Sequence, residues 1–212
     1  MNGPLTLDTP HGPARVHLRP VEGPAAGVLL LGHGAGGGVA APDLTATTAV
    51  AGEHGLIVGL VEQPYRVAGR RNVAPTHQLD AAWEAVVAGL RERGLLAANL
   101  PLICGGRSSG ARVACRTAAA TGAAGVLCLA FPLQPPVRAG REPRPSRLPE
   151  LEAVPAGVPV LVVQGIRDRF GMPPAAPGRE VVQISGDHGL KSDRAALVAA
   201  VAGWLPQPLG VS

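Results

Sequence analysis

Short continuous apolar runs alternate along this chain with longer segments of helical periodicity. The runs cover residues 27–31, 56–61, 102–104, 125–131 and 158–163, and residues 180–184 form the last expected strand. Continuous apolar runs of this length are typical of strands that are covered on both faces, as in a parallel sheet. The alternation therefore predicts an α/β fold, with a mainly parallel sheet of about eight strands and helices on both faces. The length of 212 residues fits one domain over residues 1–212.

The amino-terminal residues depart from this pattern. Residues 5–8 and 14–19 flank the turn-forming sequence Thr9-Pro10-His11-Gly12-Pro13, and Val16 and Leu18 alternate with polar residues. Alternation with a period of two is typical of a strand with one solvent-exposed face. We therefore expect an antiparallel hairpin at the amino terminus.

Helix signals lie between the apolar runs. Expected helices cover 42–54, which Gly55 ends, 76–93, which Gly94 ends, and 109 to about 121. Ser192 is expected to cap the last helix, which turns Leu197, Val198, Val201 and Trp204 toward the sheet. The proline-rich segments 132–149 and 171–178 interrupt the pattern. We interpret the first as a solvated loop, with a small mobile lid as the alternative, and expect no large cap domain.

Composition argues against several classes of protein. The formal net charge is +4, and Lys191 is the only lysine. Arginine is abundant together with Ala, Gly and Pro throughout the chain, and only 2% of residues are aromatic. These features favour a general compositional bias over a nucleic-acid surface. The amino terminus has no basic and apolar signal region, and no apolar run is long enough to cross a membrane. We expect a cytoplasmic monomer or homodimer with no nucleic-acid or membrane partner.

Cys104, Cys115 and Cys128 are odd in number and lie in apolar surroundings without the spacing of metal ligands. They are predicted to be buried free thiols in a reducing compartment. No metal site and no cofactor are expected.

Gly106-Arg107-Ser108-Ser109-Gly110 lies between the apolar run 102–104 and an expected helix. Gly-x-Ser-x-Gly fits the nucleophile elbow, a sharp strand-to-helix turn that presents a serine hydroxyl at the end of a sheet. The glycines are required because a side chain at either flank would collide with the neighbouring strand and helix. In a chain with 29 glycines the pentapeptide alone is weak evidence. Ser109 is the weaker candidate nucleophile because it lacks a glycine two residues away on each side.

A nucleophilic serine requires a general base and a third group that orients the base. His188 follows the last expected strand and should lie at the same sheet edge as Ser108. Asp168 follows the strand 158–163 and is the preferred orienting acid. Asp187 is the alternative, but neighbouring extended residues point apart, so Asp187 is expected to make local turn hydrogen bonds. The order Ser108, Asp168, His188 is the order of the elbow-type hydrolases.

The glycine-rich residues 32–38 follow the first apolar run and can present bare N–H groups to an anion. The alternative is a flexible turn. The N–H groups of Ser109 and Ala35 fit an oxyanion hole, with Gly34 as the alternative to Ala35. His33 is expected to shape the loop.

Four residues are candidates for the substrate rim: His33, Arg66, Arg107 and Gln134. Arg66, Arg70, Arg71 and Arg107 would attract an anionic substrate if they line that rim. A shallow, open site favours small acyl groups.

Several motifs together resemble a known family. They are His33-Gly34-Ala35-Gly36-Gly37, Gly106-Arg107-Ser108-Ser109-Gly110-Ala111-Arg112, Phe131-Pro132-Leu133-Gln134-Pro135-Pro136, Gln164-Gly165-Ile166-Arg167-Asp168-Arg169-Phe170-Gly171 and Gly186-Asp187-His188. The chain resembles the α/β-hydrolases over nearly its whole length, and specifically a small dienelactone-hydrolase-related group. That group is typified by the domains of testis-expressed protein thirty and non-specific-lethal complex subunit three. Its members often have His where Gln134 stands and Pro where Arg169 stands, which alters the rim. The resemblance implies the fold and the catalytic apparatus but no substrate.

The sequence thus predicts a serine hydrolase that cleaves a small-molecule acyl substrate, a carboxylic ester or thioester, through an acyl-enzyme on Ser108. The alternative is a catalytically silent scaffold or interaction domain that keeps the hydrolase fold. A dehydrogenase is disfavoured because the glycine loop lacks the dinucleotide-binding spacing and the acidic residue that follows it.

Overall fold

One eight-stranded sheet organises the computed structural model, which describes residues 3–135, 142 and 144–210. The strands lie side by side in the order β1 (Leu5–Leu7), β2 (Ala14–Arg19), β4 (Leu56–Glu62), β3 (Gly27–Gly32), β5 (Leu102–Arg107), β6 (Gly125–Leu129), β7 (Val160–Gly165) and β8 (Arg179–Ile184). β1 pairs antiparallel with β2 and β2 with β4, whereas the pairs from β4 to β8 are parallel. The predicted mixed sheet with an amino-terminal hairpin is confirmed.

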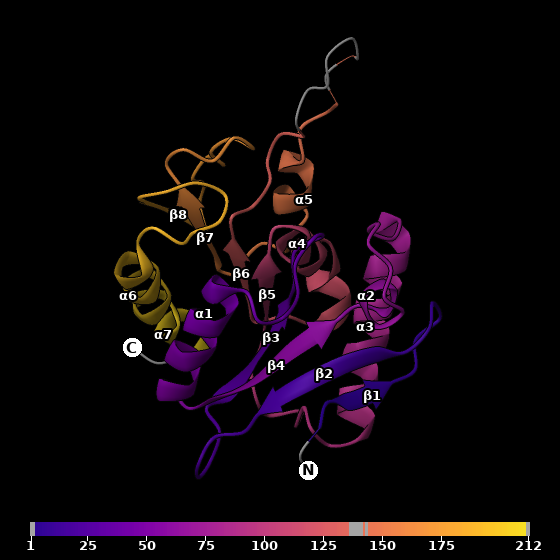
Figure 1. The fold of residues 1–212 in the computed structure, drawn as a ribbon. Coiled ribbons are helices and arrows are strands. Elements are labelled where there is room, and N and C mark those ends of the chain that lie inside the picture. The colour runs from indigo at the N-terminus through magenta and orange to yellow at the C-terminus, as the bar shows by residue number, and fades with distance from the viewer. Residues whose placement is uncertain (1–2, 136–141, 143, 211–212) are drawn as a thin grey trace.

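Helices cover both faces of the sheet (Figure 1). α1 (Pro42–Glu53), α6 (Arg194–Trp204) and α7 (Pro206–Leu209) lie on one side, and α3 (Thr76–Glu92) and α4 (Ser109–Thr121) lie on the other. Side chains of β3 alternate between the two resulting cores: Leu29 and Leu31 pack in one and Val28 and Leu30 in the other. All six residues of β3 are buried, as the continuous apolar run predicts.

The long helices agree with the sequence patterns, but short ones were not predicted. α2 (Pro64–Val67), α5 (Leu148–Glu152) and α7 are too short to show periodicity, and each has a proline in its first turn. The predicted cap of the last helix is wrong. Asp193, not Ser192, caps α6, because its carboxylate accepts the Ala196 N–H at 3.0 Å.

The proline-rich segment is described only in part. Residues 136–141 and 143 lie outside the described residues, so its interpretation as a loop or a lid stays a prediction. Residues 132–135 and 144–147 form no helix or strand. α5 then follows and is attached to α4 by the ion pairs of Glu150 with Arg112 (2.6 Å) and Arg116 (3.0 Å).

Cys104, Cys115 and Cys128 are buried and free, as predicted. Burial raises the pKa of Cys104 to about 11, so the thiol stays protonated at neutral pH. Among the residues that the structure describes, none of the helices is long and apolar enough to cross a membrane.

Candidate active site

Ser108 lies in a sharp turn between β5 and α4. Its backbone has φ 51° and ψ −104°, a positive φ that costs a non-glycine residue on the order of 1–3 kcal/mol. The Ser108 N–H donates to the carbonyl of Leu129 at the end of β6, at 2.9 Å. The strained turn therefore holds the serine side chain at the carboxyl edge of the sheet.

The glycines on both sides of Ser108 are required by close backbone contact. A Cβ at Gly106 or at Gly110 would collide with the carbonyl oxygen of Gly32 in β3. A Cβ at Gly106 would also lie 2.9 Å from the carbonyl carbon of Gly110 in α4. The predicted crowding by the neighbouring strand and helix is confirmed.

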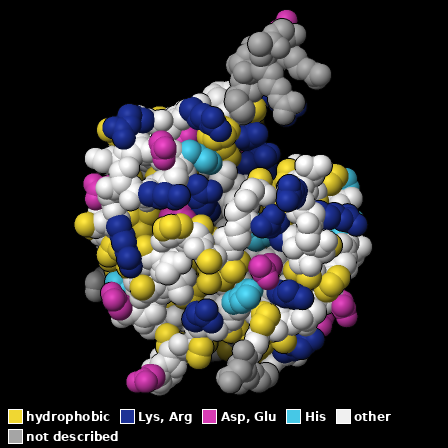
Figure 2. Space-filling view, in the orientation of Figure 1, with side chains coloured by type: hydrophobic (Ala, Val, Ile, Leu, Met, Phe, Trp, Pro, Cys, Tyr) yellow, Lys and Arg dark blue, Asp and Glu magenta, His cyan; other side chains and the backbone are white. Residues whose placement is uncertain are grey.

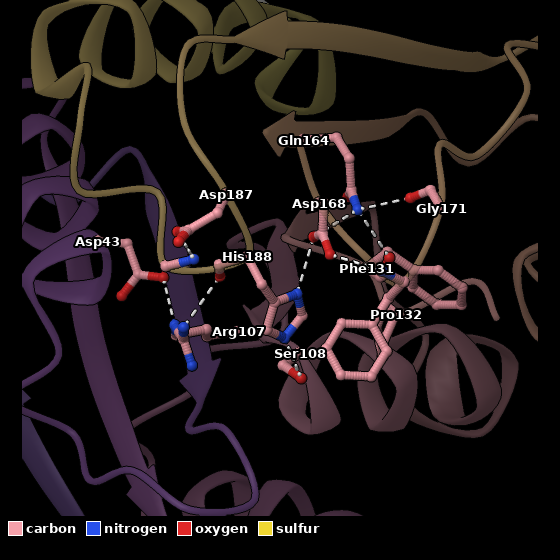
Figure 3. A network of polar contacts seen from close by, with 12 residues as sticks. Asp43, Arg107, Ser108, Phe131, Pro132, Gln164, Asp168, Gly171, Asp187 and His188 are labelled. Carbon is pink, nitrogen blue, oxygen red and sulfur yellow. Dashed lines mark hydrogen bonds and ion pairs between the residues drawn. The ribbon is translucent and has the colours of Figure 1, made fainter. Parts of the chain in front are cut away.

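Three predicted residues come together at this edge (Figure 3). His188 Nε2 lies 2.9 Å from Ser108 Oγ, and His188 Nδ1 lies 2.8 Å from Asp168 Oδ2. Ser108 follows β5, Asp168 follows β7 and His188 follows β8, so the parallel strands bring the three side chains together. Because the carboxylate accepts the Nδ1 proton, the neutral imidazole leaves Nε2 free to accept the serine proton.

Asp168 is fixed by further donors. Its side chain is 1% exposed; Oδ2 also accepts from Gln164 Nε2 at 2.8 Å, and Oδ1 accepts the Phe170 N–H at 2.9 Å. Gln164 Nε2 additionally lies 3.1 Å from the carbonyl oxygen of Phe131 and 3.0 Å from that of Gly171. Donors on both oxygens stabilise the buried carboxylate.

Gln164 and Phe170 are site residues that were not predicted from the sequence. The signal for Gln164 was available: it is a polar residue at the end of an otherwise apolar strand. The Phe170 ring packs against the His188 imidazole with 4.4 Å between ring centroids. Phe170 therefore restricts the base from one side while its N–H binds the acid.

Both ring nitrogens of His188 have hydrogen-bond partners other than Asp187. Asp187 Oδ1 accepts the Gly189 N–H at 2.8 Å, which is the local turn hydrogen bond that was expected. This contact favours Asp168 as the residue that orients His188.

The glycine-rich loop after β3 lies against Ser108. A Cβ at Gly34 would be 3.8 Å from Ser108 Cβ. Neither the Gly34 nor the Ala35 N–H has a hydrogen-bond partner within the described ranges. Ser109 is the first residue of α4, so its N–H has no acceptor within the helix. These are the N–H groups that an oxyanion hole would use.

His33 was a candidate rim residue, but this prediction is wrong: the residue is 3% exposed. Its Nε2 accepts the Gln63 N–H at 3.1 Å, which leaves Nδ1–H to donate to the Gly34 carbonyl at 2.8 Å. The Tyr65 hydroxyl donates to the Ala35 carbonyl at 3.1 Å. Hence His33 shapes the loop, as expected for it, and these contacts disfavour a flexible turn.

The loop contact of His33 should make the fold sensitive to acid. Burial lowers the pKa of His33 below its usual 6.5, because the cation would be desolvated and Nε2 could no longer accept from Gln63. The contribution of neutral His33 to the free energy of unfolding is therefore fully present above pH 6.5. It is lost as the pH falls below 6.5 toward the lower pKa that His33 has in the folded protein. Between pH 7 and 5, the melting temperature should fall more steeply for the wild type than for His33→Gln. An equal dependence of the melting temperature on pH in the two proteins would contradict this prediction. His17→Gln is the control variant.

Arg107 is held in place from two sides. Its Nε lies 2.8 Å from Asp43 Oδ2, and its Nη2 donates to the backbone carbonyl of His188 at 3.0 Å. The Asp43 side chain is completely buried in the first turn of α1, where burial raises its pKa and the Arg107 charge opposes that rise. Arg107 thus ties α1 to the loop that carries His188 (Figure 3). From the sequence, Asp43 is predicted only to lie at the start of a helix.

Breaking this ion pair from one side should be costly. Arg107→Met leaves a buried carboxylate without its partner and should lower the free energy of unfolding by about 3–5 kcal/mol. Asp43→Asn combined with Arg107→Met should recover part of that loss, because no buried charge remains. Urea unfolding of both single variants and the double variant measures the coupling. If the losses in the free energy of unfolding from the two single variants simply add in the double variant, the two side chains do not interact.

A cleft opens beside His188, with a volume of about 510 Å³. It is lined by Arg107, Arg167, Arg169, Asp187, His188, Gly189 and Lys191. Of the expected rim residues only Arg107 lines it; His33, Arg66 and Gln134 do not. Arg70 lines a separate cavity with His11 and Gln63. No three His, Cys, Asp or Glu side chains within residues 3–135, 142 and 144–210 lie close enough to hold a metal ion.

Comparisons with known proteins agree with this architecture. The model of a family described as "Alpha/beta hydrolase domain" matches residues 25–196. A search of curated proteins found no match. Among solved structures, Est1E from Butyrivibrio proteoclasticus is 14% identical with a TM-score of 0.76, over 99% of this chain and 100% of that chain.

Two further structures are similar over most of their length. XC6422 from Xanthomonas campestris, described as "a member of a/b serine hydrolase without lid", is 22% identical with a TM-score of 0.70, over 96% of this chain and 95% of that chain. The dienelactone hydrolase from Anabaena variabilis is 16% identical with a TM-score of 0.71, over 96% and 94%. At these identities the likeness shows a common fold.

Proposed function

The chain belongs to the alpha/beta hydrolase domain family, and on that premise we propose that it is a serine hydrolase of small carboxylic esters or thioesters. One observation carries the proposal: Ser108, His188 and Asp168 form a continuous chain of two hydrogen bonds at the ends of three strands. This arrangement is the one that activates a serine hydroxyl for nucleophilic attack. The names of the structural neighbours, which include a serine hydrolase and a dienelactone hydrolase, support this chemistry.

Acylation begins when Ser108 Oγ attacks the carbonyl carbon of the substrate and its proton passes to His188 Nε2. The carbonyl π electrons move onto the oxygen, which becomes an oxyanion. When that oxyanion re-forms the carbonyl, the bond to the leaving oxygen or sulfur breaks, and the leaving atom takes the proton from Nε2. The products of this half-reaction are a free alcohol or thiol and an ester of Ser108.

Deacylation repeats these steps with water. Water gives a proton to His188 Nε2 as its oxygen attacks the acyl carbon, and Ser108 Oγ recovers that proton when its bond to the acyl group breaks. Asp168 keeps Nδ1 protonated and stabilises the imidazolium that forms twice in each cycle. The N–H groups of Ser109 and of Ala35 or Gly34 donate to the oxyanion; losing one such donor costs about 10²–10³ in kcat.

The finer assignment within the family follows from the motifs. The sequences around His33, Ser108 and Asp168 resemble the dienelactone-hydrolase-related group of testis-expressed protein thirty and non-specific-lethal complex subunit three. We include the chain in that group as part of the proposal. Because the described residues form no large cap over the site, we expect small acyl groups.

A fluorophosphonate probe tests the proposal, because it reacts with an activated serine and leaves an unactivated one unmodified. We expect covalent modification of Ser108, mapped by mass spectrometry of the peptides. Ser109→Ala is the matched control and should still be labelled, whereas Ser108→Ala should not. A well-folded protein that takes no label would instead indicate a catalytically silent scaffold or interaction domain.

A further inference from the structure

The cleft beside His188 is strongly basic. Arg167 and Arg169 flank Asp168 in the loop after β7, and Lys191 follows His188 in the loop after β8. The same two loops therefore carry two of the proposed catalytic residues and three cationic side chains. Lys191 is the only lysine of the chain.

These three cations are not neutralised. Arg167, Arg169 and Lys191 are exposed and form no ion pair with another described residue. Among the described residues, Asp187 is the only acidic one that lines the cleft, and its Oδ1 accepts the Gly189 N–H. On α4, by contrast, Arg116 pairs with both Asp80 and Glu150. Figure 2 shows Lys and Arg side chains gathered on the part of this face that lies over β7 and β8.

Arg169 is placed relative to the base by an aromatic contact. Its guanidinium carbon lies 5.2 Å from the centroid of the Phe170 ring, and that ring packs at 4.4 Å against His188. A cation over an aromatic face is favoured by about 0.5–1 kcal/mol at an exposed site. The Arg169 charge is thereby held close to His188.

The proposed reaction fixes which part of the substrate meets this charge. The leaving oxygen or sulfur must lie next to His188 Nε2, because it takes its proton from that atom. His188 lines the cleft, so a leaving portion that extends from Nε2 along this side of the imidazole would reach Arg167, Arg169 and Lys191. A cleft lined by charges of one sign attracts a ligand of opposite charge and raises its rate of association.

We propose that the substrate carries an anionic group, such as a carboxylate or phosphate, on its alcohol or thiol portion, and that Arg167, Arg169 and Lys191 bind this group. This inference rests on the proposed function. Of the four arginines expected at the rim from the sequence, Arg107 lines the cleft, and Arg66, Arg70 and Arg71 do not.

The test compares two thioesters that differ in charge: S-acetyl-3-mercaptopropionate and its neutral amide. For the wild type, kcat/KM should be about tenfold higher for the carboxylate, the sum of a few exposed ion pairs. Arg167→Gln with Lys191→Gln should lower the ratio to about twofold, since Arg169 remains, while hydrolysis of the amide is retained. The control variant, Arg70→Gln with Arg71→Gln, also removes two positive charges, but outside the cleft, and should leave the ratio unchanged. Raising the salt concentration from about 20 mM to about 500 mM should also lower the ratio of the wild type.

The inference is overturned if the wild type hydrolyses both thioesters equally, or if both double variants lower the ratio alike. Either result leaves the proposed function intact as long as Ser108 is labelled. If Ser108 is not labelled and neither thioester is cleaved, the proposed function fails. The anion site is then tested separately, by calorimetric measurement of the binding of each thioester to the Ser108→Ala protein. Tighter binding of the carboxylate that is lost with Arg167→Gln and Lys191→Gln supports the site; equal or absent binding rejects it.

Discussion

Replacing Ser108 by alanine is expected to lower kcat/KM for a short activated ester by about 10⁴-fold or more. The variant lacks the oxygen that attacks the carbonyl and that lies 2.9 Å from His188 Nε2. Alanine keeps the Cβ, so the positive φ of 51° carries the same backbone strain as in the wild type. The free energy of unfolding should change by no more than about 0.5 kcal/mol. Steady-state kinetics and urea unfolding of the same preparation measure both quantities.

Ser109→Ala serves as the control for this prediction. It removes the neighbouring hydroxyl but keeps the N–H that starts α4, and it should retain most of the activity. If Ser108→Ala cleaved the ester as fast as the wild type, Ser108 would not be the nucleophile.

Asp168→Asn should have an effect of similar size, about 10⁴-fold in kcat. Every group that faces the carboxylate is a donor: His188 Nδ1–H and Gln164 on one oxygen and the Phe170 N–H on the other. An asparagine NH₂ group would meet a donor on either side. If it faces His188, the proton moves to Nε2, and the imidazole can no longer accept the proton of Ser108.

Asp187→Asn is the matched control for the acid, since among the described residues its side chain hydrogen-bonds only to the Gly189 N–H. It should leave kcat within a few-fold of the wild type. A larger loss of kcat from Asp187→Asn than from Asp168→Asn would show that Asp187, not Asp168, orients the base. Stopped-flow acylation rates separate a loss in chemistry from a loss in product release.

The sheet and its long helices could be predicted because their signals are local. Continuous apolar runs identify buried strands, and a glycine at a helix end identifies where the helix stops, as at Gly55 and Gly94. The order Ser108, Asp168, His188 then follows from which runs precede these residues. These features depend on the nearest few residues, so one sequence is sufficient to show them.

The surroundings of the site could not be predicted in the same way. Asp43 and Arg107 are 64 positions apart, and only the packing of α1 near the end of β5 makes them partners. The burial of His33, a candidate rim residue, could not be predicted for the same reason, because its Nε2 accepts from the Gln63 N–H at a different strand end. Long-range side-chain contacts of this kind leave no periodic pattern in the sequence.

The contact of Gly106 and Gly110 with the Gly32 carbonyl has a consequence for protein engineering. Three backbones meet there, and no repacking of side chains could make room for a larger residue at Gly106 or Gly110. A mutational library should therefore hold these glycines constant and vary the exposed Arg167, Arg169 and Lys191. The residues that would select the substrate can in this way change while the serine turn stays intact.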